Sequence, residues 1–281
     1  MANIIILILG VIEIFEGNLT LGEFTIITTY FNMVVGNVDY FLNFFKNYQT
    51  TLVSYNRLND ILDMEHEKIG IADAHDIVKI EFKNVSFSYT EFPLIKDFSF
   101  TFEKGKIYKI DGENGKGKST ILDLILGLHD DFSGSILFNE KDIRDFNIYK
   151  IRKNLISVVE QNLTIINGSV KKNIGLDKDI VMDQIEYLTS KINFITEDSL
   201  NTTLVRKSNN LSGGEKQKLN IIRNLLKNSK LLILDEPNSA LDANSSEALK
   251  QIILAEKENR ITILISHTDI FDEIIDGKIS L

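Results

Sequence analysis

The chain has 281 residues, of which 43% are hydrophobic and 25% are charged, so it has the composition of an ordinary globular protein of one or two domains. The absence of cysteine excludes disulfide bonds and thiolate metal sites. The formal net charge of −9 argues against a nucleic-acid partner, and we expect none.

Residues 1–17 are apolar, but they are too few to cross a bilayer, because a membrane-spanning helix needs about 20 residues. The segment contains Glu13 and has neither Lys nor Arg, whereas a secretory signal peptide begins with basic residues. Residues 18–23 then form a polar turn. A signal peptide is therefore a poor interpretation of this start.

Residues 24–45 predict one complete membrane helix, because they contain neither Lys nor Arg and are long enough to span a bilayer. Lys46 and Arg57 follow, so the positive-inside rule places the C-terminal end of the helix in the cytoplasm. The helical pattern continues through residues 48–64, which are amphipathic.

Four small or polar residues line one face of this helix, namely Asn32, Gly36, Asp39 and Asn43. Polar residues at membrane depth usually face the interior of a helix bundle or a water-filled path. Two interpretations follow, packing between helices and a face on a transport pathway. The sequence leaves both open.

A charged, glycine-containing stretch at residues 65–76 marks the domain boundary. From residue 77 the pattern changes, and residues 77–89 alternate between apolar and polar side chains as strands do. The predicted organisation is therefore a helical segment at 1–64, a linker at 65–76 and a second domain at 77–281.

Residues 112–119 fit the pattern G-x-x-x-x-G-K-[ST] between a predicted strand and a predicted helix. In such a P-loop, backbone N–H groups and the positive end of the helix surround phosphates. Lys118 would reach the β- and γ-phosphates, and the Ser119 hydroxyl would bind Mg²⁺. The alternative is an ordinary glycine-rich turn before a helix.

Residues 211–215, LSGGE, predict the start of a helix, with Ser212 and Glu215 as a capping box. Gly213 and Gly214 in its first turn would expose backbone N–H groups to an approaching anion. The sequence therefore predicts a second place at which backbone groups can meet phosphate.

Residues 230–237, KLLILDEP, predict a buried parallel strand that ends in Asp235. Asp235 suits the shell of a magnesium ion, and Glu236 could orient or deprotonate an attacking water. The alternative is an acidic residue that caps the next turn. Residues 261–267, ITILISH, predict another buried strand ending in His267.

Taken together, these stretches resemble the C-terminal part of an ATP-binding-cassette (ABC) exporter, and they occur in the order of that family. The matching stretches are GENGKGKST (112–120), SVVEQ (157–161), LSGGEKQKLNIIRNLL (211–226), LLILDEPNSALD (231–242) and ISH (265–267). In addition, FSY (87–89) is similar to the family's segment whose aromatic residue stacks on adenine.

The resemblance implies a role for each matching residue. Tyr89 would stack on adenine, Glu236 would be the catalytic carboxylate and His267 would contact the γ-phosphate. Magnesium would be organised by Ser119, Gln161 and Asp235. The phosphates of ATP would be held by Gly112, Glu113, Asn114, Gly115, Lys116, Gly117, Lys118, Ser119 and Thr120. Ser212, Gly213 and Gly214 would complete the site of a second, facing domain, and residues 239–242 would line the seam.

The resemblance also implies a fold and partners. We expect an α/β P-loop ATPase domain with a parallel core sheet, an antiparallel β edge and a helical subdomain near residues 175–228. One partial and one full transmembrane helix would precede it, as the end of the fifth and the whole sixth helix of an exporter. The partners would be a second ATPase domain, facing head to tail, and further transmembrane helices from elsewhere.

The function implied is ATP hydrolysis that drives export across the cell membrane, with the ATPase domain in the cytoplasm. Two alternatives remain, a non-translocating ATP-binding relic or regulator and a soluble ABC ATPase of repair or translation. The predicted membrane helix argues against the second. The sequence assigns neither the cargo nor a homodimer over a heterodimer. We expect the chain to be the C-terminal piece of a split or truncated exporter whose other helices are encoded upstream.

Overall fold

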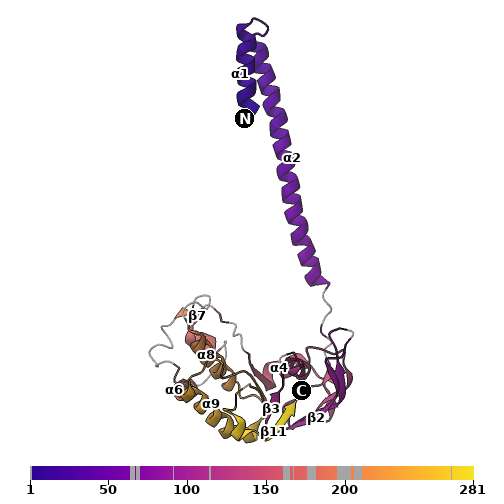
Figure 1. Cartoon of the computed structure of the whole chain (residues 1–281), viewed down its shortest axis with the longest axis vertical. Coiled ribbons are helices and arrows are strands. Elements are labelled where there is room, and N and C mark those ends of the chain that lie inside the picture. The colour runs from indigo at the N-terminus through magenta and orange to yellow at the C-terminus, as the bar shows by residue number, and fades with distance from the viewer. Residues whose placement is uncertain are drawn as a thin grey trace. The chain divides into compact units, whose positions relative to one another are not determined.

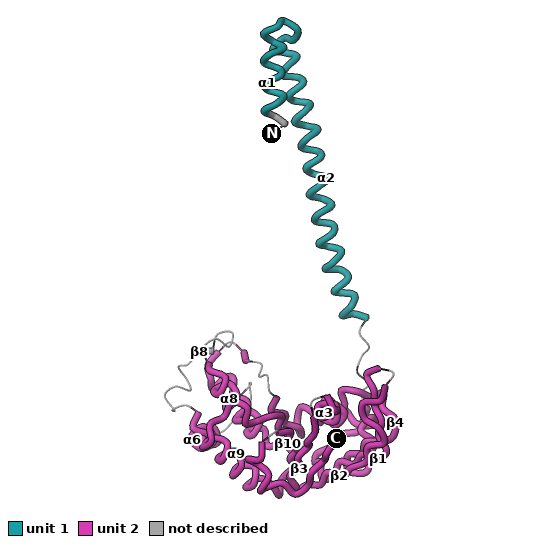
Figure 2. The backbone as a smooth tube through the Cα atoms, in the orientation of Figure 1, with its two compact units in different colours: residues 1–67 teal, residues 68–281 magenta. Residues whose placement is uncertain are grey.

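The computed structural model divides the chain into two compact units, residues 1–67 and residues 68–281 (Figure 2). It describes residues 2–63, 67, 70–90, 92–113, 115–160, 165–166, 168–175, 182–194, 204–205, 211–266 and 268–281.

The first unit consists of helix α1 (Ala2–Phe15) and helix α2 (Leu21–Leu62), which has 42 residues (Figure 1). A capping box begins α2, because the Glu23 N–H donates to Thr20 Oγ1 over 3.2 Å and the Thr20 N–H donates to Glu23 Oε2 over 2.8 Å. The helix therefore starts inside the predicted polar turn at 18–23. The T-x-x-E pattern of residues 20–23 is the sequence signal for this start.

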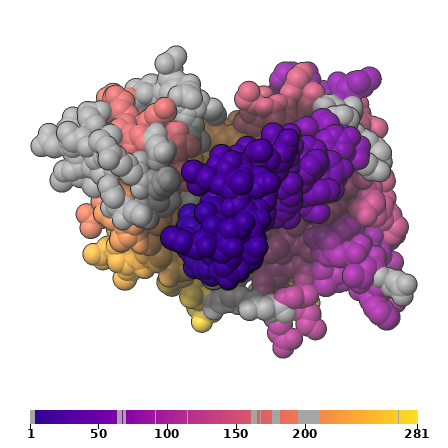
Figure 3. Space-filling model, turned by 90° about the horizontal axis from the view of Figure 1, so that it is seen from above, coloured from indigo at the N-terminus to yellow at the C-terminus, as the bar shows by residue number. Residues whose placement is uncertain are grey.

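Helices α1 and α2 pack at Gly10, where a Cβ atom would lie 2.0 Å from the ring of Phe24. Side chains on the same side of α2 are half-buried, namely Phe24, Thr28, Phe31 and Val35. The residues of the predicted polar face, Asn32, Gly36, Asp39 and Asn43, are all exposed, and none of the residues of α2 is fully buried. Figure 3 shows the side chains of this unit as one surface, coloured indigo to violet.

None of the helices among the described residues is long and apolar enough to cross a membrane. This finding corrects the prediction of one full and one partial transmembrane helix. Helix α1 has 14 residues, fewer than the roughly 20 that a span requires. Within residues 24–45, seven polar side chains lower the mean hydropathy, and they are Thr25, Thr28, Thr29, Asn32, Asn37, Asp39 and Asn43. The lack of Lys and Arg was therefore an insufficient criterion.

The second unit is built on a parallel sheet of five strands, as predicted. In spatial order, the strands are β11 (Gly277–Ser280), β3 (Ile107–Asp111), β10 (Ile261–Ile265), β9 (Leu231–Asp235) and β6 (Ile156–Val159). All neighbouring pairs run parallel. Strand β10 is buried along its whole length, which explains its continuous apolar sequence.

A second sheet is antiparallel and has four strands. Their spatial order is β2 (Ile95–Glu103), β1 (Lys79–Phe87), β4 (Ser133–Phe138) and β5 (Lys141–Asp142). A small third sheet pairs β7 (Gly168–Ser169) with β8 (Leu204–Val205). The sequence expectation of an antiparallel β edge corresponds to the sheet around β1.

Helices complete the described part of the second unit. They are α3 (Lys118–Ile125), α4 (Ile148–Leu155), α5 (Val170–Gly175), α6 (Met182–Lys191), α8 (Gly213–Leu225) and α9 (Ala243–Ala255), with short 3₁₀ turns η1 (Ile143–Asp145), η2 (Lys257–Asn259) and η3 (Asp272–Ile274). Helices α6 and α8 lie in the predicted helical insertion near residues 175–228.

The parallel sheet separates two hydrophobic clusters, because successive side chains of a strand point to opposite faces. Ile233 and Ile263 belong to the cluster that includes α3, α4 and the antiparallel sheet. Leu232, Leu234 and Leu264 belong to the cluster that includes α5, α6, α8 and α9. Burial on both faces fixes strands β9 and β10, and thereby the residues at their carboxyl ends.

Candidate nucleotide site

The carboxyl ends of β3 and β9 bring the glycine-rich loop and the acidic pair into one pocket. This pocket has a volume of about 260 Å³, and it is lined by Leu94, Gly115, Gly117, Lys118, Ser119, Thr120, Asp235, Glu236 and Ile265. Crevices at the carboxyl ends of parallel strands are the usual ligand sites of open α/β sheets. The structure therefore assembles two motifs that are far apart in the sequence.

Glycines shape the loop that leads from β3 into α3. Gly115 and Gly117 have φ angles of 81° and 96°, which lie in the left-handed region that side chains disfavour. Gly117 is the N-cap of α3 and makes no side-chain capping hydrogen bond. The first N–H groups of α3 are thus available to an anion, together with the positive end of the helix dipole.

Lys118 is nearly buried, with an exposed fraction of 9%. Its Nζ atom donates hydrogen bonds to the carbonyl oxygens of Gly112 and Glu113, over 2.6 and 3.2 Å. These contacts hold the ammonium group against the start of the glycine-rich loop, which precedes Lys118 in the sequence. The next residue, Ser119, is exposed and lines the same pocket, whereas Thr120 is buried.

Asp235 and Glu236 place two carboxylates at the end of β9. Burial raises the pKa of Asp235 above its ordinary value, the charge of Glu236 raises it further, and Lys118 opposes the shift. Glu236 has a φ angle of 47°, a conformation that costs a non-glycine residue about 1–3 kcal/mol. The hydrogen bond from its N–H to the carbonyl oxygen of Ile265, over 2.9 Å, helps to hold it there.

The donor set in this pocket fits magnesium. Mg²⁺ prefers oxygen ligands and typically binds one or two carboxylates together with the phosphates of a nucleotide. The Ser119 hydroxyl and the Asp235 carboxylate supply such oxygens in the same pocket, where burial and then the charge of Glu236 raise the pKa of Asp235, and a bound cation would favour its ionised form. Among the described residues, no cluster of three or more His, Cys, Asp or Glu side chains could hold a metal ion. The predicted magnesium ligands, Ser119, Gln161 and Asp235, include only one such side chain, so they would not form a cluster of that type.

Tyr89 does not line this pocket. It is 57% exposed and belongs to a group of three rings, with centroids 4.9 Å from Phe87 and 5.3 Å from His129. Its hydroxyl oxygen lies 3.3 Å from His129 Nε2. The sequence analysis missed Phe87 and His129 as neighbours of Tyr89, and no sequence pattern links residue 129 to residue 89.

The LSGGE stretch begins helix α8 as predicted. The Glu215 N–H donates to Ser212 Oγ over 3.3 Å, and the Ser212 N–H donates to Glu215 Oε2 over 2.7 Å, which confirms the capping box. Ser212, Gly213 and Gly214 do not line the pocket of the glycine-rich loop. Gly214 lies against Ala240, where a Cβ atom would be 2.9 Å from the carbonyl oxygen.

Three predicted site residues lie outside the described part of the chain, namely Asn114, Gln161 and His267. Glu113 and Lys116 are exposed, and their side chains form a long ion pair of 4.0 Å.

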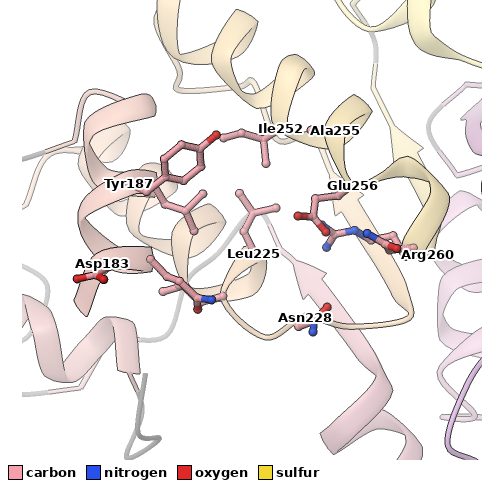
Figure 4. Close-up of a pocket in the computed structure, with 12 residues that line it drawn as sticks. Asp183, Tyr187, Leu225, Asn228, Ile252, Ala255, Glu256 and Arg260 are labelled. Atoms are coloured by element: carbon pink, nitrogen blue, oxygen red, sulfur yellow. The ribbon is translucent and has the colours of Figure 1, made fainter. Parts of the chain in front are cut away.

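A larger pocket, of about 540 Å³, contains none of the predicted site residues (Figure 4). It lies where α6, α8 and α9 approach one another, and its lining includes Tyr187, Leu225, Ile252 and the ion pair between Glu256 and Arg260, whose atoms are 3.1 Å apart. The smaller pocket, by contrast, is lined by seven of the predicted site residues, namely Gly115, Gly117, Lys118, Ser119, Thr120, Asp235 and Glu236.

The parallel sheet, the glycine-rich loop and the acidic strand end define a P-loop nucleotide-binding domain. The family model described as "ABC transporter" matches residues 95–239, which is just over half of the chain. The chain therefore belongs to the ABC transporter family, and it contains an ATPase domain of that family.

Curated relatives agree with this assignment. A probable ABC transporter ATP-binding/permease protein of Haemophilus influenzae is 31% identical and aligns with 99% of this chain and 52% of its own length. An ATP-dependent lipid A-core flippase of Pasteurella multocida is 32% identical over 90% of this chain and 45% of its own. A heavy metal tolerance protein of Schizosaccharomyces pombe is 30% identical over 88% and 31%. The chain spans between 31% and 52% of the length of these relatives.

A solved structure, a bacterial Atm1-family ABC exporter with ATP bound, matches with a TM-score of 0.72 and 25% identity. The match covers 94% of this chain and 48% of the exporter chain. The part of this chain that the match leaves out is shorter than the helical unit, residues 1–67. The structural similarity therefore extends into that unit.

Proposed function

We propose that this chain is the ATPase end of an ABC exporter, in which it binds and hydrolyses ATP and thereby drives export of a substrate. The observation that carries the proposal is the pocket in which the P-loop residues Lys118 and Ser119 meet Asp235 and Glu236. The relatives described above, which include a flippase and a permease, support transport as the purpose of that chemistry.

The residues predicted from the sequence have the following proposed roles. The backbone N–H groups of residues 112–120 bind the phosphates, and Lys118 pairs with the charge between the β- and γ-phosphates. Ser119, Gln161 and Asp235 hold Mg²⁺, which neutralises phosphate charge when bound. Glu236 orients a water for attack and accepts its proton. Tyr89 stacks on adenine, and His267 contacts the γ-phosphate.

The active unit is a dimer of two ATPase domains that face head to tail. Ser212, Gly213 and Gly214 do not line the pocket of their own P-loop, so we assign them to the nucleotide of the partner. A two-fold axis makes both sites equivalent, and residues 239–242 line the seam between the domains.

The helical unit joins further helices of the transporter at the cell membrane, and the ATPase domain lies in the cytoplasm. None of the 42 residues of α2 is fully buried, which supports this assignment, because its exposed large hydrophobic side chains would gain stability by burial against a partner. Its exposed large side chains include Tyr40, Phe41, Leu42 and Phe44.

The test uses Glu236→Gln and Lys118→Ala. Glu236→Gln should keep ATP binding, accumulate an ATP-bound dimer and lower turnover by about 10²-fold or more, as loss of a positioned base does. Lys118→Ala should lose affinity for Mg-ATP, as measured by calorimetry. Turnover of Glu236→Gln at the wild-type rate, or unchanged ATP affinity of Lys118→Ala, would overturn these assignments.

A further inference from the structure

The larger pocket, where α6, α8 and α9 approach one another, has no role in the proposed ATP site. Its volume of about 540 Å³ lies within the usual range of small-molecule pockets, about 300–1,000 Å³. Its lining comes from α6, the end of α8, the end of α9 and the turn that leads into β10. It shares no lining residue with the pocket of the glycine-rich loop.

The lining includes a buried positive charge with an unused hydrogen-bond donor. Arg260, which directly precedes β10, is 3% exposed. Its Nη2 atom lies 3.1 Å from Glu256 Oε2. Its Nη1 atom is also buried and has no hydrogen-bond partner among the described residues. Because an unpaired buried donor costs free energy, a ligand that brings an acceptor to Arg260 would be favoured.

The carboxylates of the lining restrict the charge that such a ligand can carry. Figure 4 shows Glu256 beside Arg260, and the Glu256 side chain is 43% exposed, so a ligand can reach it. Asp183 adds a second negative charge, and Arg260 is the one cation among the described residues that line the pocket. A purely anionic ligand would be repelled by two carboxylates, whereas a ligand with one positive and one negative group finds a partner for each.

The distance between the two charges restricts the ligand further. The paired atoms of Arg260 and Glu256 are 3.1 Å apart, so the two charges of the ligand must also be close together. An ammonium and a carboxylate on the same carbon atom meet this condition. The α-amino acids have that arrangement.

Large apolar and aromatic side chains line the rest of the pocket. Tyr187 comes from α6, Leu225 from α8 and Ile252 from α9 (Figure 4). A ligand side chain that lies against these three would be removed from water, which favours an apolar side chain over a polar one.

We propose that this pocket binds an α-amino acid with a large apolar side chain. The ligand carboxylate accepts a hydrogen bond from Arg260, and its ammonium pairs with Glu256. Its side chain lies against Tyr187, Leu225 and Ile252. The proposed ATPase has no part in this inference, because the site is formed by other residues.

The experiment measures binding of L-phenylalanine to the whole 281-residue chain by saturation-transfer NMR, without nucleotide. Two further probes keep the ring and lack one charged group each, namely 3-phenylpropionate, which has no ammonium, and 2-phenylethylamine, which has no carboxylate. L-phenylalanine should bind. Each of the other two should bind about tenfold more weakly, the loss expected for one charge-assisted hydrogen bond.

Ala255→Trp tests the place of binding, because Ala255 is an exposed residue that lines the pocket. Leu254→Trp is the matched control, since Leu254 is its exposed neighbour on α9 and does not line the pocket. Ala255→Trp should fill the pocket and abolish binding, and Leu254→Trp should bind as the wild type does. Arg260→Lys, which keeps the charge but loses the planar guanidinium, should bind about tenfold more weakly.

A wild-type chain that does not bind L-phenylalanine at millimolar concentration would overturn the inference. Equal affinities for the three probes, or an unchanged affinity in Ala255→Trp, would overturn it as well. If Arg260→Lys melts at a lower temperature than the wild type, Ala255→Trp decides the outcome, because its position is exposed. No nucleotide is present, so these results leave the proposed ATPase to its own test with Glu236→Gln and Lys118→Ala.

Discussion

The position of the Asp235 carboxylate lowers the stability of the folded chain. Burial and the neighbouring charge of Glu236 raise its pKa, so the fold disfavours its ionised form. Because the folded-state pKa is raised, stability falls as the pH rises from the ordinary value through the raised one, and it is fully restored below the ordinary value. A residue that destabilises the fold in this way is expected at a functional site, where stability and activity compete.

Asp235→Asn should therefore stabilise the nucleotide-free chain at neutral pH and lower magnesium-dependent turnover by about 10²-fold or more, because the proposed metal ligand is lost. The free energy of unfolding is measured by urea titration at several pH values. The gain should disappear at about pH 3, where Asp235 is protonated in both the folded and the unfolded state. A loss of stability at neutral pH would contradict this account of the site.

At the scale of elements, the close contact between α8 and segment 236–242 depends on a missing side chain. Gly214→Ala places a Cβ atom 2.9 Å from a backbone carbonyl oxygen, whereas Gly213→Ala adds one in open space. Overpacking of this kind costs about 1–3 kcal/mol, and alanine favours a helix over glycine by up to about 1 kcal/mol. Gly214→Ala should therefore be less stable than Gly213→Ala.

Urea titration of the two variants measures this difference directly. Both substitutions change the helix propensity in the same way, so the comparison isolates the contact with Ala240. Equal stability of the two variants would mean that segment 236–242 does not rest on α8.

The pairing of α1 with α2 depends on Gly10 in a similar way. Gly10→Leu would collide with the ring of Phe24, whereas a Cβ atom at Gly36 meets no described atom within 4 Å. Spin labels on exposed Ile5 and Tyr30 can report the separation of the helices, because the chain has no native cysteine. The label distances should lengthen and broaden in Gly10→Leu and stay unchanged in Gly36→Leu. Unchanged distances in both would exclude Gly10 as the contact.

The sequence predicted the elements whose signal is local. Strands β9 and β10 are continuous apolar runs, and the P-loop and the capping box of α8 have fixed spacings. The structure added what depends on tertiary contacts. The ring of His129 beside Tyr89, the amide of Gln217 beneath Glu236 and the ammonium of Lys218 beside Asp242 join residues from different elements, and no periodicity encodes such pairs.

In the helical unit, the sequence predicted the secondary structure but not the surroundings of the helix. A count of residues without Lys or Arg predicted a membrane span at 24–45, although Thr and Asn side chains recur throughout that stretch. Thr25 and Thr29 direct their hydroxyl groups to helix carbonyl oxygens, over 2.9 and 2.7 Å, so the helix itself satisfies them. Helical periodicity was therefore a sound guide to the secondary structure, and the charge count was a poor guide to the surroundings of the helix.

At the scale of the whole molecule, the head-to-tail model predicts complementation between inactive chains. A Ser212→Arg chain keeps its P-loop, and a Lys118→Ala chain keeps the residues of its LSGGE stretch, Ser212, Gly213 and Gly214, which are called the signature here. Each homodimer therefore has two defective sites. A mixed dimer pairs one intact P-loop with one intact signature. Random mixing should therefore restore roughly a quarter of wild-type ATPase activity, because half of the dimers are mixed and each has one working site.

Activity is measured after the two chains are mixed in equal amounts with ATP, and each variant alone serves as the baseline. Cross-linking shows whether dimers form. If mixed dimers form and remain inactive, Ser212 and Lys118 do not contribute to the same composite site.

The order of strands in the parallel sheet has a consequence for the breadth of the pocket. Strand β10 alone separates β3, which leads into the P-loop, from β9, which ends at Asp235. Adjacent strands lie about 4.8 Å apart, so the ends of β3 and β9 are about 10 Å apart. This interval is set by main-chain hydrogen bonding rather than by any side chain. Substitutions in the two cores can thus weaken the domain as a whole while the spacing between the ends of β3 and β9 is retained.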